Sequence, residues 1–287
     1  MIDMMEWKDR FKTPVRLKLH IMHTGEVHAK GNIHFNPKSP KFKSLPKEHR
    51  FNPVFSFLVV HPSHGPLLLD TGLHHSFNES RFGNFGPLLG TMVRARTKPG
   101  KDVRSQLDAM GIRSRDIRYV LLSHLHLDHP GGLSYFAGSP NAEVFVDKEE
   151  LKAARAPFST LKGYVKSHLA GIDFLPIPYD GSAPPFEGAC DFFGDGSVLV
   201  VRTSGHTKGH SSVILNAMDG PIILTFDAVH RRANLDEGVP PVGEYLKALS
   251  TMRNIESFLK EFPHARVVFG HDPDQLMELK LVPEYYT

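Results

Sequence analysis

The feature that most constrains this chain is a cluster of three histidines and one aspartate within six consecutive residues: His124, His126, Asp128 and His129. Four apolar residues precede the cluster and predict a short buried strand, which the following Pro-Gly-Gly ends. If strand geometry continues through them, His124 and His126 project to the same side, whereas Asp128 and His129 follow a turn and can face a second ion. Imidazole and carboxylate groups suit zinc and neighbouring divalent metals. A solvated histidine-rich loop is the alternative, but the spacing favours a metal site.

More ligands are expected elsewhere, because each metal ion needs three to four of them. His206 lies on a glycine-flanked turn after an apolar run, Asp227 ends the run 222–226, and His271 follows the run 267–270. A lone His or Asp at such a position is more often a polar turn residue or a helix cap than a ligand. The pattern of short strand, turn and ligand-type residue occurs four times, however, which predicts a site along one edge of a sheet.

Three further polar residues have supporting roles in this interpretation. His210 is expected to be structural, because the next strand already begins after it. Asp70, in a Leu-Leu-Leu-Asp-Thr-Gly segment, and Asp272, beside His271, are expected to orient the imidazoles of the ligands.

The order of these motifs resembles the metallo-β-lactamase superfamily of dinuclear metal hydrolases. It consists of HxHxDH, then Gly-His-Thr, then a strand-terminal Asp, then Gly-His near the end of the sequence. Within the superfamily the chain is most similar to the N-acyl homoserine lactonases, which degrade quorum-sensing signals. The features that favour this branch are Asp-Thr-Gly at 70–72, Phe-Gly-Asn-Phe at 82–85, and the ending 269–272 with 282–285. The resemblance covers most of residues 15–286.

The resemblance implies two divalent metal ions, with zinc first and cobalt, manganese or iron as alternatives. The implied ligands are His124, His126 and His206 for one ion, Asp128, His129 and His271 for the other, and Asp227 as the bridge between them. Two such ions activate a water molecule and polarise a carbonyl, so that no protein nucleophile is needed.

Two residues are expected to act in catalysis. The resemblance implies that Asp128 passes a proton to the leaving oxygen. Similar lactonases have a Tyr three residues after the bridging Asp, where this sequence has His230 instead. A ring nitrogen of His230 can donate to the substrate carbonyl; the alternative is that the side chain faces away.

An apolar segment with interspersed glycines lies between the Asp-Thr-Gly motif and the next predicted helix. It is a candidate wall for the acyl chain of a lactone substrate. Its apolar residues are Phe77, Phe82, Phe85, Leu88, Leu89 and Met92. The alternatives are an ordinary hydrophobic core or a contact within a homodimer.

Length and periodicity predict one domain, residues 1–287, with an αββα sandwich fold. The chain has 287 residues of which 40% are hydrophobic, enough for an ample core. Strands are expected near 15–22, 54–60, 66–70, 118–122, 142–146, 198–202, 211–216, 221–226 and 266–269, and helices near 101–110, 147–155 and 243–262. Hairpins followed by strands that helices separate fit two packed sheets with helices outside.

Composition argues against several other classes of protein. The net charge of +3 comes from 34 basic and 31 acidic residues that are broadly mixed, which does not indicate a nucleic-acid partner. No apolar run approaches the roughly 20 residues needed to cross a bilayer. The first residues are charged and lack the apolar segment of a secretory signal. With a single cysteine, Cys190, an internal disulfide is excluded, and the expected location is cytoplasmic.

Other functions remain open on the same motifs. A different hydrolase on this scaffold would cleave a thioester, another lactone, a phosphodiester or a β-lactam. From another class, a di-iron redox module would carry Glu in place of His126 together with a flavin domain. A metal-free binding domain should have lost ligands, whereas all seven candidates are present.

Overall fold

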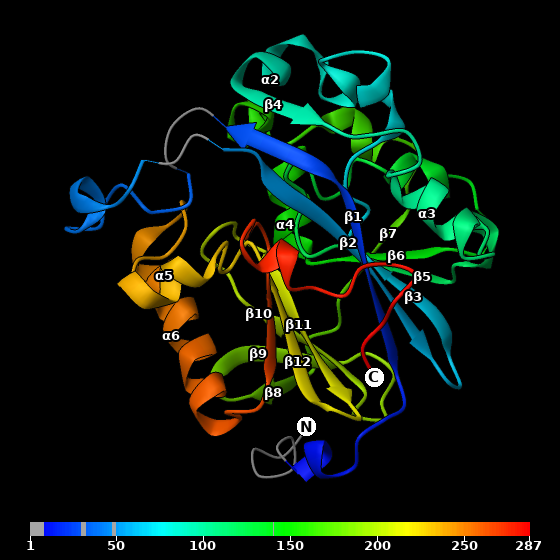
Figure 1. Cartoon of the computed structure of the whole chain (residues 1–287), viewed down its shortest axis with the longest axis vertical. Coiled ribbons are helices and arrows are strands. Elements are labelled where there is room, and N and C mark those ends of the chain that lie inside the picture. Colours follow the sequence, from blue (N-terminus) through cyan, green and yellow to red (C-terminus); the bar gives the residue numbers. More distant parts are fainter. Residues whose placement is uncertain (1–8, 30–32, 48–49, 140) are drawn as a thin grey trace.

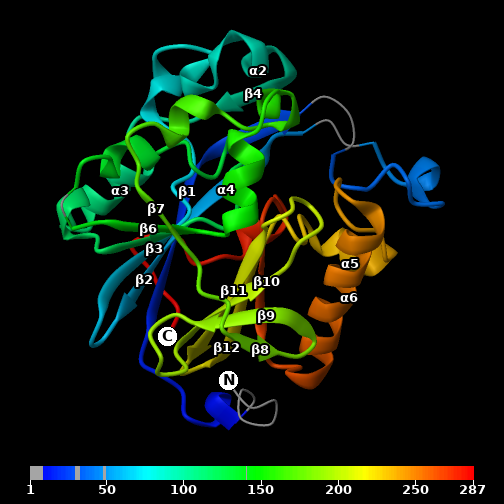
Figure 2. The same cartoon turned by 180° about the vertical axis from the view of Figure 1, so that it is seen from behind.

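The computed structural model describes residues 9–29, 33–47, 50–139 and 141–287. Two β-sheets pack face to face in these residues, with helices on the outer sides (Figures 1 and 2). The first sheet has the order β4-β1-β2-β3-β5-β6-β7 and the second the order β13-β12-β11-β10-β9-β8. The predicted αββα sandwich is thereby confirmed.

The first sheet combines antiparallel and parallel pairs. β1, β2 and β3 form an antiparallel meander, and β3, β5, β6 and β7 are parallel neighbours that longer connections join. The strands are β1 (Lys18–Ala29), β2 (Asn52–His61), β3 (Gly65–Leu69), β4 (Val93–Arg96), β5 (Tyr119–Leu121), β6 (Glu143–Val146) and β7 (Phe174–Pro176). The sequence predicted five of them, but placed the end of β1 too early and missed β4 and β7.

The second sheet is antiparallel from β8 to β12, and β13 adds to it in parallel beside β12. Its strands are β8 (Gly181–Ala183), β9 (Phe186–Asp191), β10 (Val198–Arg202), β11 (Ser211–Ala217), β12 (Gly220–Phe226) and β13 (Arg266–Phe269). The sequence analysis predicted the other four strands of this sheet and missed β8 and β9.

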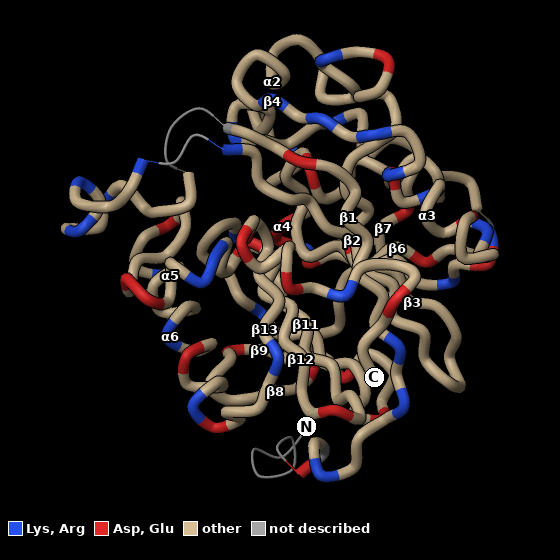
Figure 3. Tube along the Cα trace, viewed as in Figure 1, with Lys and Arg blue, Asp and Glu red and all other residues tan. Residues whose placement is uncertain are grey.

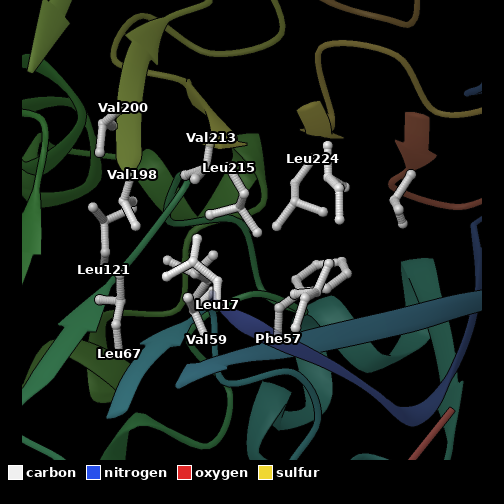
Figure 4. Close-up of a cluster of buried hydrophobic side chains, with 14 of the residues drawn as sticks. Leu17, Phe57, Val59, Leu67, Leu121, Val198, Val200, Val213, Leu215 and Leu224 are labelled. Atoms are coloured by element: carbon white, nitrogen blue, oxygen red, sulfur yellow. The ribbon is translucent and has the colours of Figure 1, made fainter. Parts of the chain in front are cut away.

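The main core fills the space between the sheets. Figure 4 shows Leu67 and Leu121 of the first sheet facing Val198 and Val200 of the second. Alternate residues of β10 point to the outer face of the sheet. Leu199 there belongs to a second cluster, which includes Met252 and Phe258 of the helix 245–261. Because both faces of these strands are buried, they read as continuous apolar runs.

The helices cover the outer faces. They are α2 (Gly86–Met92), α3 (Val103–Ala109), α4 (Lys148–Arg155), α5 (Arg232–Glu237) and α6 (Tyr245–Glu261). In Figure 1, α5 and α6 lie on one flank and α3 on the opposite flank. Met252, Ile255 and Phe258, at intervals of three residues, form the buried stripe of α6, whereas Leu246, in its first turn, is 75% exposed.

Charged residues of both signs are interspersed along the described part of the chain, as Figure 3 shows. Among the helices of the described residues, none combines the length and the apolar character that a membrane span requires.

Candidate metal centre

Strands of both sheets end at the candidate centre. β3 and β5 run parallel, so Asp70 and the His124 cluster follow strand ends at one edge of the first sheet. β10 and β12 are both antiparallel to β11, and β13 is parallel to β12, so His206, Asp227 and His271 follow carboxyl ends at one edge of the second. The recurring strand-turn-ligand pattern therefore arises because parallel strands present their carboxyl ends together.

The histidine cluster itself is not a strand. β5 ends at Leu121, so the condition that strand geometry continues through His124 and His126 is not met. The backbone N–H of Leu125 donates to the Glu150 carboxylate (3.0 Å) and that of Leu127 to the Gly163 carbonyl (2.9 Å). The segment leaves the sheet because these groups, and not a neighbouring strand, take its hydrogen bonds.

The structure brings all seven predicted ligands together. His124, His126 and His206 form one group with ligand atoms within 4.8 Å of one another, and Asp128, His129 and His271 form a second. These are the same two triplets that the resemblance implied.

Asp227 lies between the two groups. Its Oδ2 is 3.3 Å from Nε2 of His206 and 3.7 Å from Nε2 of His124. Its Oδ1 is 3.3 Å from Nε2 of His129 and 3.2 Å from Nε2 of His271. Burial raises the pKa of this carboxyl, but the surrounding imidazoles hold it well below its usual range, so Asp227 is ionised. One carboxylate thus offers one oxygen to each group.

For His206 and His271, a hydrogen bond on the far side of the ring fixes the direction of the nitrogen that faces the centre. Nδ1 of His206 donates to the Val242 carbonyl (2.9 Å), and Nδ1 of His271 donates to the Pro53 carbonyl (2.8 Å). A neutral imidazole that donates from Nδ1 keeps its lone pair on Nε2, which here faces the centre.

Asp70 fixes the orientation of two candidate ligands of the first sheet, His129 directly and His124 through Ser123. Its Oδ2 accepts from Nδ1 of His129 (2.7 Å) and from the Ser123 hydroxyl (2.7 Å). Ser123 Oγ in turn lies 3.1 Å from Nδ1 of His124. The predicted orienting role of Asp70 agrees with these contacts. Asp272, by contrast, accepts from the backbone N–H groups of Arg232 and Asp274, and the hydrogen bonds of the described residues give no support to its predicted orienting role.

The chemistry of the donor set fits divalent metal ions. Nε2 of His124, Nε2 of His129 and Oδ1 of Asp227 are buried and have no hydrogen-bond partner among the described residues. Burial lowers the pKa of His124 and His206 well below the ordinary value and that of His126 to about 3, so these rings are neutral, as a metal ligand has to be. Buried, unpaired lone pairs around a carboxylate are costly without a cation.

Two residues hold Asp227 in place. The backbone N–H of Asp227 donates to Nε2 of His210 (3.1 Å), whose Nδ1 lies 2.8 Å from the Thr203 hydroxyl. The predicted structural role of His210 agrees with these bonds. Gly270 leaves the space that Asp227 needs, because a Cβ there would lie 2.4 Å from the Phe226 carbonyl oxygen and 3.0 Å from Oδ1 of Asp227.

Glu150 was not singled out from the sequence. This buried carboxylate on α4 accepts from the N–H of Leu125, in the histidine cluster, and from that of Gly209 (3.1 Å), in the turn after His206. One side chain thus joins the ligand segments of the two sheets. Burial raises its pKa, although the hydrogen bonds oppose this.

His230 lies inside the centre, 1% exposed. Its Nε2 is 3.1 Å from Oδ2 of Asp227, and its Nδ1 is 3.2 Å from Nδ1 of His34. Burial keeps the pKa of His230 below its ordinary value, so the ring is neutral and has one N–H. Because a carboxylate can only accept, Nε2 donates to Asp227 and Nδ1 accepts from His34, a buried residue that the sequence did not indicate.

The candidate acyl wall divides into two parts. Phe77, Phe85 and Leu89 are buried in one cluster together with Leu127 of the histidine segment and Val165. Leu88 and Met92 on α2 are 55% and 46% exposed. Phe82 lies between these extremes, with the Arg81 guanidinium 4.5 Å from its ring centroid.

Fold and site together define a class of metallohydrolase: an αββα sandwich with two His/Asp groups that share a carboxylate at the sheet edges. A family model described as the metallo-beta-lactamase superfamily matches residues 49–271. The chain belongs to this superfamily.

Curated relatives and solved structures show which members of the superfamily the chain is similar to. An N-acyl homoserine lactonase from a Bacillus species is 32% identical over 240 residues, which are 81% of this chain and 86% of the relative. The N-acyl homoserine lactonase AttM of Rhizobium radiobacter is 30% identical over 82% of this chain and 88% of its own. Among solved structures, AiiA of B. thuringiensis with N-decanoyl-L-homoserine at its active site is 25% identical with a TM-score of 0.77, covering 95% of this chain and all of its own.

Proposed function

We propose that this protein is a metal-dependent hydrolase that opens the lactone ring of N-acyl homoserine lactones. The observation that carries the proposal is the position of Asp227, whose two oxygens face two separate groups of ligands. The relatives named above, which are N-acyl homoserine lactonases, supply the substrate class.

The donor set supports two divalent ions per chain, with zinc as the first candidate. His124, His126 and His206 would hold one ion, and Asp128, His129 and His271 the other, with Asp227 shared. Such a pair supplies Lewis-acid activation of a water molecule and of the lactone carbonyl. A water nucleophile is also favoured because neither Ser123 nor Cys190 is in a state to act as the nucleophile. Ser123 is buried and donates to Asp70, and burial raises the pKa of Cys190 to about 11.

Asp128 is the proton carrier in this proposal. Its Oδ2 lies 3.6 Å from Nε2 of His271, and the side chain is 10% exposed, so it lies beside a candidate ligand and keeps some contact with solvent. Ring opening breaks the bond between the carbonyl carbon and the ring oxygen, and the departing oxygen needs a proton to become the alcohol of N-acyl homoserine.

His230 is the second catalytic candidate. If the Asp227 carboxylate held metal ions, it would accept less strongly from the Nε2–H of His230, and this N–H could donate to the substrate carbonyl. His34 on the other nitrogen keeps the donor on Nε2. One preorganised donor of this kind contributes roughly 10²-fold or more in kcat where nothing else stabilises the oxyanion, and less where metals do so.

The test is a kinetic panel of lactone, thioester, phosphodiester and β-lactam substrates with the metal-loaded protein. We expect acid release from N-acyl homoserine lactones and a product that re-closes to the lactone on acidification. Release of free homoserine lactone and a fatty acid would show an amidase. Turnover of another member of the panel, without any of the lactones, would assign a different hydrolase on this scaffold.

A further inference from the structure

His168 is a buried imidazole without a full set of partners. It is 5% exposed and lies in the short 3-10 turn Lys166–Leu169. Neither ring nitrogen makes a hydrogen bond of normal geometry within the described residues, and a contact with the backbone of Asn84 serves one nitrogen at most. An imidazole buried with a nitrogen unpaired is costly, which indicates that a partner outside the protein completes it.

A second unpaired group lies beside it. The side-chain amide of Asn84 donates from Nδ2 to the Gly131 carbonyl (2.7 Å), directly after the metal-ligand segment. Its Oδ1 is buried and has no partner among the described residues. The pair therefore offers an unpaired acceptor on Asn84 and, on the neutral His168, an N–H donor.

His168 lies beside the apolar cluster next to the metal centre. The ring of His168 lies 6.3 Å from that of Phe85 between centroids. Phe85 belongs to the cluster of Phe77, Leu89 and Leu127, which is the buried part of the candidate wall. The Asp128 carboxylate is close enough to raise the pKa of His168, against the stronger opposing effect of burial. The polar pair thus lies where the wall meets the proposed proton carrier.

We propose that Asn84 and His168 form a subsite for the amide group of the acyl chain. A secondary amide presents one N–H donor and one carbonyl acceptor, which complement the free Oδ1 of Asn84 and the N–H of His168. The inference rests on the proposed lactonase function and adds to it the group that distinguishes N-acyl homoserine lactones from plain alkyl lactones. Leaving buried polar partners unpaired is an effective way to reject a substrate that lacks the matching group.

The test compares N-hexanoyl homoserine lactone with γ-decalactone, which has a lactone ring and an alkyl chain but no amide. We expect His168→Phe to lower kcat/KM for the first substrate by about tenfold or more, mainly through KM. For γ-decalactone we expect a change of less than twofold. The melting temperature should stay the same or rise, because the variant removes an unpaired polar group from an apolar cluster.

Two further comparisons separate recognition from packing. His20→Phe is the matched control, since His20 on β1 also has an unpaired nitrogen but lies outside the metal centre; it should leave both substrates unaffected. An ester analogue of the substrate keeps the acyl carbonyl and lacks the N–H. Wild type should discriminate against it by about tenfold or more, and Asn84→Ala should lose most of that discrimination.

The outcomes distinguish the two proposals. Equal losses of His168→Phe on both lactones, or no loss on either, would overturn the amide subsite while the lactonase function stands. A wild-type protein that opens γ-decalactone but not the amide substrate would overturn both the subsite and the homoserine lactone assignment. A lower melting temperature together with equal losses would assign His168 a packing role.

Discussion

Oδ2 of Asp70 lies 2.7 Å from Nδ1 of His129, although 59 residues separate the two in the chain. The carboxylate fixes the proton of His129 on Nδ1 and so directs Nε2 to the centre. Asp70 itself has a φ of 53°, a left-handed conformation that Asp and Asn tolerate better than other side chains.

Asp70→Asn should therefore weaken metal binding without disturbing the backbone. Loss of an orienting partner of this kind typically lowers metal affinity or activity about 10–100-fold. Competition with a chromogenic chelator measures the affinity. Glu79→Gln is the matched control, because it also removes a carboxylate from a histidine, the exposed His75, which belongs to no candidate metal group of the described residues. Equal metal affinity of Asp70→Asn and wild type would contradict the orienting role.

Asp227→Ala should lose more metal than any change at Asp70. Elemental analysis of wild-type protein after careful loading is expected to give close to two equivalents per chain, since seven ligands exceed what one ion needs. The variant loses an oxygen from both groups at once. One equivalent or fewer in wild type would rule out the dinuclear assignment.

His230→Ala should retain its metals and lose kcat by about tenfold or more, and His230→Tyr should recover part of that loss. His34 acts through His230 if their contact sets the proton position. We therefore expect His34→Ala to lower kcat by a smaller factor and to have almost no further effect in the His230→Ala background. Wild-type rates from His230→Ala with full metal content would exclude this side chain from the reaction.

The two parts of the candidate wall should respond differently to mutation. Phe85→Ala removes a ring from a buried cluster and should destabilise the protein by about 3–5 kcal/mol in denaturant unfolding. Leu88→Ser, on the exposed side of α2, should leave stability within roughly 0.5 kcal/mol and raise KM for long acyl chains more than for short ones. If Leu88→Ser changed KM equally for all chain lengths, Leu88 would not be part of the surface that contacts the acyl chain.

The stability of the wild-type protein should fall between pH 6.5 and about 4 by more than that of His168→Phe. Burial, the largest effect, lowers the pKa of His168 from 6.5 to about 4; the Asn84 backbone raises it, His74 lowers it and Asp128 raises it. In this window the unfolded chain binds a proton that the folded chain does not. The free energy of unfolding is therefore highest above pH 6.5. As the pH falls, protonation of His168 in the unfolded chain lowers it by roughly 3 kcal/mol at most. Urea unfolding of both proteins across this range measures the difference.

The candidate metal ligands could be singled out from sequence because they follow short apolar strands, a local pattern that can be recognised without knowledge of the fold. The family assignment and the sandwich fold are confirmed. His34 and Glu150 could not be found in this way. His34 meets His230 across 196 residues, and Glu150 looked like an ordinary charge on a short amphipathic helix until tertiary packing placed it between two loops.

The short strands that were missed lack a local signal for a similar reason. β4 has only four residues, Val-Arg-Ala-Arg, with alternate positions exposed, and β8 has three. Such strands form because a longer neighbour offers free backbone groups, as β1 does for β4. The histidine cluster shows the opposite case: its sequence could extend a strand, but its backbone N–H groups bond to Glu150 and Gly163 instead of to a neighbouring strand.

The ligands of each group come from both sheets: His124 and His126 follow β5, whereas His206 follows β10, and Asp128 and His129 meet His271 from β13. An ion in either group would therefore cross-link the two layers of the sandwich. Because it binds only the docked arrangement, free metal should raise the unfolding temperature in proportion to the logarithm of its concentration once binding is saturated. Removal of the metal by a chelator would then weaken the packing of one sheet on the other before it weakens the hydrogen bonds within either sheet.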